Sequence, residues 1–242
     1  MSGNIDKELI KDGIRLDGRK PNELRDIKIE AGVLNRADGS AYVEWGYNKV
    51  LAAVYGPTEV HPKHLMESNK AIIQCKYNMA AFSVSDRKRP GPDRRSVEIS
   101  KVIKEAIDHT VLTEKFPRAS ITVLIEILQA NAGTRVAGLT AASVALADAG
   151  IPMKGLIQGC AVGKVGDTVV LDLDKEEDNF GQADLPVGML NGPDGVEFVL
   201  MQMDGDMTPE EINKGFSYLL EAREVIEKLQ RDALERKYSK KV

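Results

Sequence analysis

The chain has 242 residues, of which 43% are hydrophobic and 29% are charged, as is typical of a soluble globular protein. This composition excludes a disordered chain, a collagen-like chain and a small disulfide scaffold. The formal net charge of −4 argues against a protein that coats nucleic acid with its whole surface, but it leaves room for a local basic patch.

Cysteine usage and hydropathy indicate a protein of a reducing compartment. Cys75 and Cys160 lie in apolar, strand-like runs and match no metal-binding spacing, so we expect buried free thiols. The sequence shows no N-terminal signal segment and no apolar stretch of membrane-spanning length. We therefore expect a cytoplasmic protein that has no contact with a membrane.

The predicted elements begin with a polar, glycine-containing arm over residues 1–20. Apolar and β-branched runs then predict strands at 26–32, 41–47, 49–55, 71–79, 120–128, 160–164, 168–173, 184–190 and 196–203. Apolar residues at helical spacing predict helices over 96–111 and 139–149, and from a capping box at Thr208–Glu211 to about residue 236. Residues 237–242 are expected to form a flexible tail. Without internal repeats or a linker, the pattern predicts a single α+β domain over 1–242.

Missing motifs argue against a triad enzyme, a dinucleotide-dependent dehydrogenase and a zinc hydrolase. The sequence has no Walker-type phosphate loop, no dinucleotide-binding glycine fingerprint, no nucleophile elbow and no paired-histidine zinc motif. Its three histidines, His61, His64 and His109, are too few and too poorly spaced for a zinc site. The chemistry has therefore to be sought in three other segments.

The first segment is Asn131-Ala-Gly-Thr-Arg135, between a predicted buried strand and an alanine-rich helix. A glycine-containing turn at a helix N-terminus exposes backbone N–H groups and carries partial positive charge, which suits phosphate. Thr134 adds a hydroxyl donor, and Arg135 adds a planar guanidinium that matches phosphate oxygens. The alternative is a plain turn with a solvated arginine.

The second segment is a loop over residues 83–95 that is punctuated by proline and glycine. Residues 85–96 hold five basic side chains against two aspartates. Such a loop suits a polyanion, because each phosphate that it neutralises releases counterions. The alternative is a solvated charge run.

The third segment covers residues 171–186 and holds six carboxylates against one lysine, with Asp178 and Asp184 six positions apart. Crowded carboxylates bind a hard divalent cation, or their like charge raises the pKa of one member until it can donate a proton. The alternative is an acidic surface loop. Together, the three segments supply what phosphoryl transfer at the end of a nucleic acid requires.

These segments resemble the RNase PH-type phosphorolytic exoribonucleases. The resemblance rests on residues 128–135, 141–152 and 178–184, and on the motifs Arg15-Leu-Asp-Gly-Arg19 and Asp93-Arg-Arg95. Residues 61–64, 151–154 and 205–209 are most similar to the catalytic RNase PH-like subunit of the archaeal exosome.

The resemblance implies an RNase PH-like fold, similar to ribosomal protein S5 domain 2, with mixed sheets and packed helices. It implies a 3′→5′ exoribonuclease that degrades RNA with inorganic phosphate, its co-substrate, to nucleoside 5′-diphosphates and in reverse adds RNA tails. The expected partners are the 3′ end of single-stranded RNA, an inactive RNase PH-like paralogue in a hexameric ring of three heterodimers, and cap proteins with S1 or KH domains. Mg²⁺ or Mn²⁺ is the expected metal.

The family pattern also implies roles for basic and small residues of this sequence. Gly133, Thr134 and Arg135 are expected to bind the attacking phosphate. Arg94 and Arg95 are expected to bind the backbone phosphates of the last nucleotides.

The remaining implied roles fall on two carboxylates and on a basic pair. Asp178 is the expected general acid and Asp184 its partner, and both are expected ligands of the metal. Lys63 and His64 are expected to face the ring channel and to contact incoming RNA.

Two alternative functions stay open at the level of sequence. The first alternative is a non-catalytic RNA-binding scaffold subunit of the ring. The second is a homohexameric bacterial-type RNase PH that trims tRNA 3′ ends. The joint presence of Arg135, Asp178 and Asp184 favours an enzyme over a scaffold. A bacterial-type enzyme would be active alone, whereas we expect this chain to be poorly active until it is mixed with its paralogue.

Overall fold

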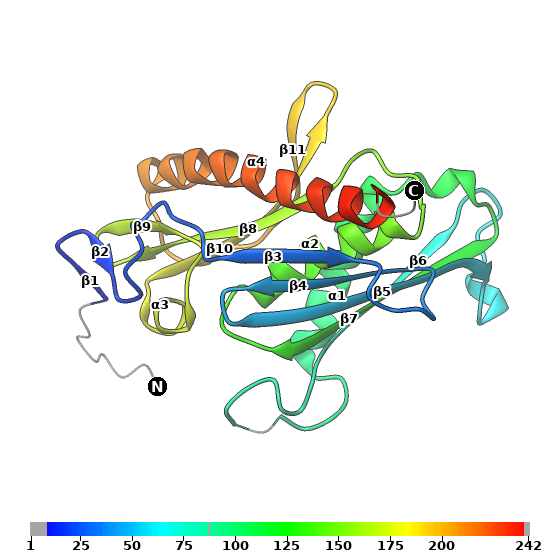
Figure 1. Ribbon diagram of the computed structural model, residues 1–242, viewed down its shortest axis with the longest axis horizontal. Helices are drawn as coiled ribbons and strands as arrows, with labels where there is room; N and C mark the ends of the chain where they lie inside the picture. The colour runs from blue at the N-terminus through cyan, green and yellow to red at the C-terminus, as the bar shows by residue number, and fades with distance from the viewer. Residues whose placement is uncertain (1–8, 87, 240–242) are drawn as a thin grey trace.

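The computed structural model describes residues 9–86 and 88–239, which contain two five-stranded sheets with helices between and around them (Figure 1). A small hairpin of β1 (Ile10–Lys11) and β2 (Ile14–Arg15) precedes the sheets. The arm predicted over residues 1–20 is wrong for residues 10–15, which pair as a hairpin with the Arg15 side chain buried. Residues 1–8 of this prediction lie outside the described residues. None of the helices within the described ranges has the length and apolar character that crossing a membrane requires.

The first sheet has the strand order β3-β4-β5-β7-β6. Its strands are β3 (Ile27–Ala31), β4 (Gly39–Trp45), β5 (Asn48–Glu59), β6 (Ile72–Met79) and β7 (Ala119–Gln129). All neighbours are antiparallel except β6 and β7, which run parallel, so the sheet is mixed. The predicted strands of this half are confirmed, with ends shifted by a few residues.

The second sheet has the order β11-β10-β8-β9, and β12 pairs with one end of β10. Its strands are β8 (Ile157–Val165), β9 (Thr168–Leu171), β10 (Ala183–Gly192), β11 (Gly195–Met201) and β12 (Asp204–Gly205). Every pair in this sheet is antiparallel.

Helix α2 (Thr134–Asp148) is almost wholly buried and contacts β4 and β5 of the first sheet and β8 of the second. The sheets approach it closely at two glycines. An added Cβ at Gly39 would lie 2.3 Å from the carbonyl oxygen of Ala145, and one at Gly159 would lie 2.5 Å from that of Val136. Since close-packed interiors do not absorb such overlaps, both glycines are needed for this packing.

Helix α1 (Arg94–Thr110) contacts β6 and β11, and α4 (Pro209–Ser239) contacts β3, β8 and β9. The capping box predicted at the start of α4 is confirmed by bonds from Thr208 N to Glu211 Oε2 at 2.8 Å and from Glu211 N to Thr208 Oγ1 at 3.3 Å.

The predicted flexible tail is wrong for residues 237–239, which continue α4. Lys237 forms an ion pair with the buried carboxylate of Asp148, and the Tyr238 hydroxyl donates to the Asp148 carbonyl oxygen at 3.0 Å. These contacts hold the last turn of the helix against α2. Residues 240–242 lie outside the described residues.

One hydrophobic cluster draws on both sheets, with members from Ile29 in β3 to Ala233 in α4. Cys160 is buried in it, as predicted, whereas Cys75 is only partly buried against its edge. A shared core of this kind is what the prediction of a single domain requires.

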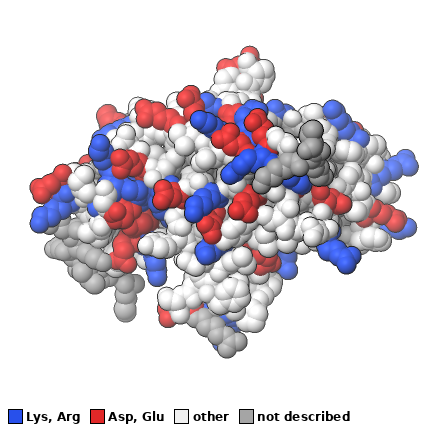
Figure 2. All heavy atoms as spheres, viewed as in Figure 1, with Lys and Arg blue, Asp and Glu red and all other residues white. Residues whose placement is uncertain are grey.

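Basic and acidic side chains are interspersed over the face shown in Figure 2. Among the residues drawn there in colour, no continuous basic surface is presented to a nucleic acid.

Candidate active site

The turn between β7 and α2 leaves the N-terminus of α2 open. Gly133 is the N-cap residue in a left-handed conformation (φ 66°), and Ala132 before it is also left-handed (φ 53°). No side chain caps this helix, and the bond from Ala137 N to Gly133 O at 3.1 Å closes its first turn. The N–H groups of residues 134–136 have no partner within the helix, so this end can bind an anion. We call residues 131–135 the phosphate-binding turn.

The hydroxyl of Thr134 is held by a neighbour on β6. The Tyr77 hydroxyl donates to Thr134 Oγ1 at 2.8 Å, and both side chains are buried. Burial raises the pKa of Tyr77 to about 12, so the phenol stays protonated and remains the donor. The proton of Thr134 is therefore available to a bound anion.

Arg135 faces the same space with unused hydrogen-bonding capacity. Its Nε is buried and has no hydrogen-bond partner in the described part of the chain. Its guanidinium forms a long ion pair, with 3.7 Å between Nη2 and Glu98 Oε1. The side chain is 19% exposed, so the accessible part of the guanidinium can donate to an incoming anion.

Arg94 and Arg95 begin α1, which corrects the predicted helix start at residue 96. The N-cap Asp93 pairs with Lys88 Nζ at 2.7 Å and accepts from Ser96 N, also at 2.7 Å. These contacts hold the pKa of Asp93 well below its usual value. The basic loop is thus partly neutralised by its own aspartate, while the two arginines stay exposed.

The predicted acidic loop contains a short helix, α3 (Lys175–Phe180), which carries Asp178. Asp184 lies at the start of β10, where the pairing with β12 sets it opposite Asp204. The strand pairing thus adds a third carboxylate to the two predicted from the sequence.

Other carboxylates of this segment serve the fold, which corrects the picture of one crowded acidic loop. Asp174 caps α3, and Asp172 and Glu177 are buried in ion pairs with Arg25 and Arg15. Crowding among all six acids therefore does not occur, because these three are already paired or used as a cap.

Both candidate catalytic carboxylates hold a proton more tightly than a free aspartate does. Burial raises the pKa of Asp184 to about 7, and Asp178 adds to the shift while Arg135 and Arg95 oppose it. The side chain of Asp178 is exposed, yet the protein around it excludes part of the water, and this partial burial raises its pKa. The positive charges of Arg95, Arg25 and Arg135 lower the pKa but do not cancel that effect. Burial, and not the like charge that we expected, is thus the main cause at both positions.

Two adjoining cavities bring these groups together. The larger, of about 840 Å³, is lined by charged side chains that include Arg94, Arg95, Arg135, Asp178, Asp184 and Asp204. The other, of about 570 Å³, is lined by Gly133 and Thr134 of the phosphate-binding turn. Arg95, Asp178 and Asn179 border both cavities, so we treat the two as one cleft. The phosphate-binding turn, the arginines and the carboxylates therefore face one space.

Lys63 and His64 lie far from the cleft. They are exposed in a short helical turn that follows the end of β5 at Glu59. Glu59 pairs with Ala119 at the start of β7, whereas the phosphate-binding turn follows Gln129 at the other end of that strand, about 30 Å away. Their expected contacts with RNA therefore belong to another surface and stay a prediction.

The carboxylates of the cleft suit a hard divalent cation with few protein ligands. Asp178, Asp184 and Asp204 all line the larger cavity, so several carboxylates border the space that a cation would enter, beside Arg95 and Arg135. The described residues contain no group of three or more His, Cys, Asp or Glu side chains placed to hold a metal ion. Mg²⁺ commonly uses one or two carboxylates, and waters and substrate phosphates complete its shell. The residues present fit such a shared site.

Sequence reasoning missed Tyr77, Glu98, Gln202 and Asp204, which line or support the cleft. Glu98 had a local signal, since it lies one helical turn beyond Arg94 and so shares its face. The others had none, because strand pairing between distant segments brings them to the cleft.

Asp184→Asn is expected to stabilise the fold more at pH 8 than at pH 5 when divalent cations are chelated. A carboxylate whose pKa rises from 3.8 to about 7 is protonated at low pH, and the cost of burying its charge grows as the pH rises through that interval. Removing the charge should raise the free energy of unfolding by roughly 1–2 kcal/mol at pH 8, allowing for partial exposure, and by less at pH 5. Urea denaturation measures both values, and an equal effect at the two pH values would contradict the raised pKa.

Fold and cleft together define the class of protein. Residues 23–152 match the profile of the 3′ exoribonuclease family, domain 1 (RNase PH), and residues 155–217 match domain 2 of that family. The two matches contain the cleft residues named above. The chain therefore belongs to the RNase PH family of 3′ exoribonucleases, and the resemblance stated from its sequence is confirmed.

Similar proteins indicate which members of the family this chain resembles. The exosome complex component Rrp41 of Thermoplasma volcanium is 60% identical over 232 residues, which are 96% of this chain and 93% of that protein. The protein of the same name from Thermococcus kodakarensis is 58% identical over 97% of this chain and 93% of its own length. The crystal structure of rice (Oryza sativa) Rrp46 has a TM-score of 0.82 at 26% identity, and the match covers 91% of this chain and 100% of that one. The predicted RNase PH-like fold is thus confirmed.

Proposed function

We propose that this chain is the phosphorolytic 3′→5′ exoribonuclease subunit of an archaeal exosome ring. Membership of the 3′ exoribonuclease family supports action at RNA 3′ ends, and relatives named as exosome components support the assembly. The observation that carries the proposal is that Arg135 of the phosphate-binding turn and Asp178 on α3 line the same cavity. Phosphorolysis needs an anion-binding group and a proton donor that face the same reacting phosphorus.

In this reaction an oxygen of inorganic phosphate attacks the phosphorus of the terminal phosphodiester. The bond from that phosphorus to the 3′-oxygen of the preceding nucleotide breaks, which releases a nucleoside 5′-diphosphate and a shortened RNA. The reverse reaction adds nucleotides from nucleoside diphosphates. Because the attacking group and the RNA are both anions and the leaving oxygen is basic, the site has to supply positive charge and a proton.

The phosphate-binding turn and the arginines supply the charge. The N–H groups at the start of α2, the Thr134 hydroxyl and the Arg135 guanidinium are proposed to bind the attacking phosphate, and their exposure to the cleft supports this role. Arg94 and Arg95, which line the larger cavity, are proposed to bind the backbone phosphates of the last nucleotides. Held in this way, the two anions meet at a fixed geometry and with their repulsion reduced.

Asp178 is the proposed general acid for the leaving 3′-oxygen. It borders both cavities of the cleft, whereas Asp184 borders only the larger one, so Asp178 reaches the phosphate-binding turn and the second carboxylate alike. When no metal ion is bound, burial raises its pKa, which favours the protonated form that a proton donor needs. Asp184 is the proposed partner that positions it.

Mg²⁺ or Mn²⁺, held by Asp178 and Asp184, is the proposed cofactor. A bound divalent cation supplies charge to the transferring phosphoryl group. The two carboxylates line one cavity with Arg135, so the cation and the attacking phosphate would share that space.

The proposed partners are the 3′ end of single-stranded RNA, an inactive RNase PH-like paralogue in a hexameric ring, and cap proteins with S1 or KH domains. The names of the relatives support assembly into an exosome. Lys63 and His64 are proposed to contact RNA before it reaches the cleft. Lys63 pairs with Glu59 at 3.1 Å with both side chains exposed, and an exposed pair of this kind is easily exchanged for an RNA phosphate.

A phosphate-dependence assay tests the proposal. Labelled single-stranded RNA with Mg²⁺ should be shortened to nucleoside diphosphates when inorganic phosphate is added and should stay intact without it. The assay is run with the chain alone and after mixing with its paralogue, and we expect the mixture to be more active. Nucleoside monophosphates formed without phosphate would show hydrolysis and contradict the proposal.

The alternative functions give different results in the same assay. A homohexameric bacterial-type enzyme would be fully active as the isolated chain. A scaffold subunit would bind RNA, but substitutions in its cleft would leave the rate of the ring unchanged. The presence of Arg135, Asp178 and Asp184 in one cavity favours the active enzyme, because a scaffold does not need all three.

A further inference from the structure

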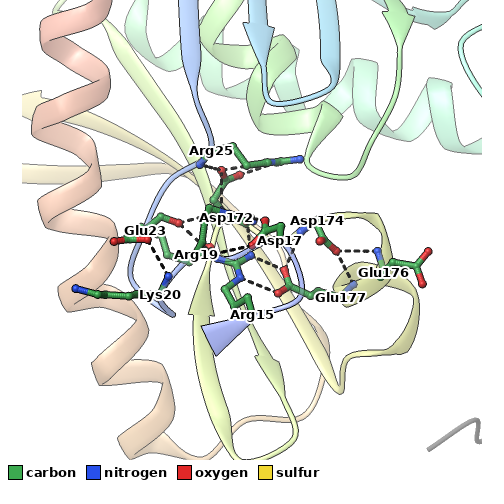
Figure 3. Close-up of polar contacts among 12 residues, drawn as sticks. Arg15, Asp17, Arg19, Lys20, Glu23, Arg25, Asp172, Asp174, Glu176 and Glu177 are labelled. Carbon is green, nitrogen blue, oxygen red and sulfur yellow. Dashed lines mark hydrogen bonds and ion pairs between the residues drawn. The ribbon is translucent and has the colours of Figure 1, made fainter. Parts of the chain in front are cut away.

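A network of buried charges joins the segment before β3 to the end of β9 (Figure 3). Asp172 directly follows β9, and its side chain is 1% exposed. It accepts hydrogen bonds from Arg25 N at 2.8 Å, Nε at 3.0 Å and Nη2 at 2.6 Å, and from Trp45 Nε1 at 2.9 Å. Burial alone would raise the pKa of Asp172, but Arg25 holds it below its usual value, so the carboxylate is ionised.

The same guanidinium also contacts the phosphate-binding turn. Arg25 Nη1 donates to the carbonyl oxygen of Asn131 at 2.6 Å. An added Cβ at Gly133 would lie 3.1 Å from Arg25 Nη2, so the guanidinium packs against the backbone of the turn. Arg25 therefore supports the element that would hold the attacking phosphate.

Beyond Asp172 the network holds helix α3. Asp174 accepts from the backbone N–H groups of the first turn of that helix. Glu177 is buried and accepts from Arg15 Nε at 2.7 Å, while Arg15 Nη1 donates to the carbonyl oxygen of Leu171 at 2.6 Å. Asp178 follows Glu177 directly. The position of the proposed general acid is thus set by a short helix that is anchored next to Asp172.

We propose that Arg25, acting through Asp172 and Asn131, is a positioning residue that keeps the phosphate-binding turn in register with the helix that bears Asp178. Arg25 and Asn131 belong to the segment that matches family domain 1, and Asp172 and Asp178 to the segment that matches domain 2. One side chain therefore bridges the two segments that form the cleft. This inference rests on the proposed function.

Arginine suits this bridge because its planar fork donates in several directions at once. A lysine at position 25 would pair with Asp172 through a single ammonium and leave the Asn131 carbonyl oxygen without its donor. A misplacement of about 1 Å between reacting groups is able to lower a rate about 100-fold. A small shift of the turn relative to α3 is therefore enough to be measured.

The test is Arg25→Lys in the assembled, active complex. We expect kcat to fall about 10- to 100-fold, while the KM for RNA stays near that of the wild type. The matched control is Lys237→Met, which breaks an ion pair to an equally buried carboxylate, Asp148, at the opposite end of α2 from the phosphate-binding turn. It should lower the melting temperature and leave kcat unchanged.

A second variant covers the case in which Arg25→Lys does not fold. Asp172→Asn removes the charge that orients Arg25 but keeps an acceptor, and we expect the same loss of kcat without a matching change in the KM for RNA. Circular dichroism sets an assay temperature at which each variant is folded.

Two results would be decisive against the inference. If Arg25→Lys and Asp172→Asn lose stability but keep the wild-type kcat, as Lys237→Met should, then Arg25 has a purely structural role. If the wild-type complex releases no nucleoside diphosphates, the proposed function fails, and the inference fails with it. The first result requires an active wild type and the second an inactive one, so the two failures are told apart.

Discussion

Asp178→Asn is expected to lower kcat for phosphorolysis about a hundred- to ten-thousandfold, the range that loss of a general acid produces. Asparagine keeps the shape of the side chain but has no acidic proton for the leaving 3′-oxygen. Because the side chain of Asp178 is exposed at the cleft, the fold and the affinity for RNA should change little. Single-turnover cleavage rates and fluorescence anisotropy with labelled RNA measure the two quantities.

An exposed aspartate between β10 and β11 provides the matched control. Asp194→Asn removes the same charge outside the residues that line the cleft, and it should leave kcat unchanged. Asp184→Asn in the same assay separates the two carboxylates, because we expect it to raise the Mg²⁺ requirement more than it lowers kcat at saturating Mg²⁺. Near-normal kcat in Asp178→Asn with complete loss in Asp184→Asn would transfer the acid role to Asp184.

Local sequence signals predicted most of the fold because most elements carry their own pattern. Helix α4 begins where the capping box at Thr208 and Glu211 placed it. Helix α2 begins five residues before its predicted start because its N-cap is Gly133, without a capping side chain. A start made by a left-handed glycine leaves no side-chain signal of the usual kind.

Helix α3 was missed because it is short, charged and without apolar periodicity. Its local signal was Asp174 followed three positions later by Glu177, which is a capping box. Its main support was beyond local sequence reasoning, since Arg15 lies 162 positions before Glu177. A contact over that separation follows from the packing of the N-terminal segment on the second sheet.

Some residues of the candidate site could likewise be predicted from local sequence, whereas others are brought there only by long-range contacts. Arg135, Asp178 and Asp184 stand out by residue type and motif, and the fold places them on one cavity. Asp204 enters through the pairing of β10 with β12, and Tyr77 through the position of β6 under the phosphate-binding turn. Such partners depend on strand register, which hydrophobic pattern alone does not assign between distant segments.

Arg135→Met is expected to lower kcat/KM for inorganic phosphate about 100- to 1000-fold, the loss that removing one preorganised donor from a charged transition state produces. The substitution should cost little stability, because Nε of Arg135 is unpaired within the described residues and its ion pair with Glu98 is long. The loss of rate would therefore reflect the missing contact with phosphate. Arg135→Lys should lie between wild type and Arg135→Met, since it restores the charge without the planar fork. Initial rates at varied phosphate and saturating RNA give the value.

The matched control for Arg135 is Arg36→Met, which removes one positive charge from an exposed position outside the cleft and should leave both KM values unchanged. It separates a local effect from the change in net charge, as does a comparison at raised salt, where long-range attraction is screened. If Arg135→Met raised the KM for RNA and left that for phosphate unchanged, Arg135 would bind the RNA backbone. The attacking phosphate would then have to be held by the N–H groups of α2 and Thr134 alone, and the case for phosphorolysis in this cleft would lose its main support.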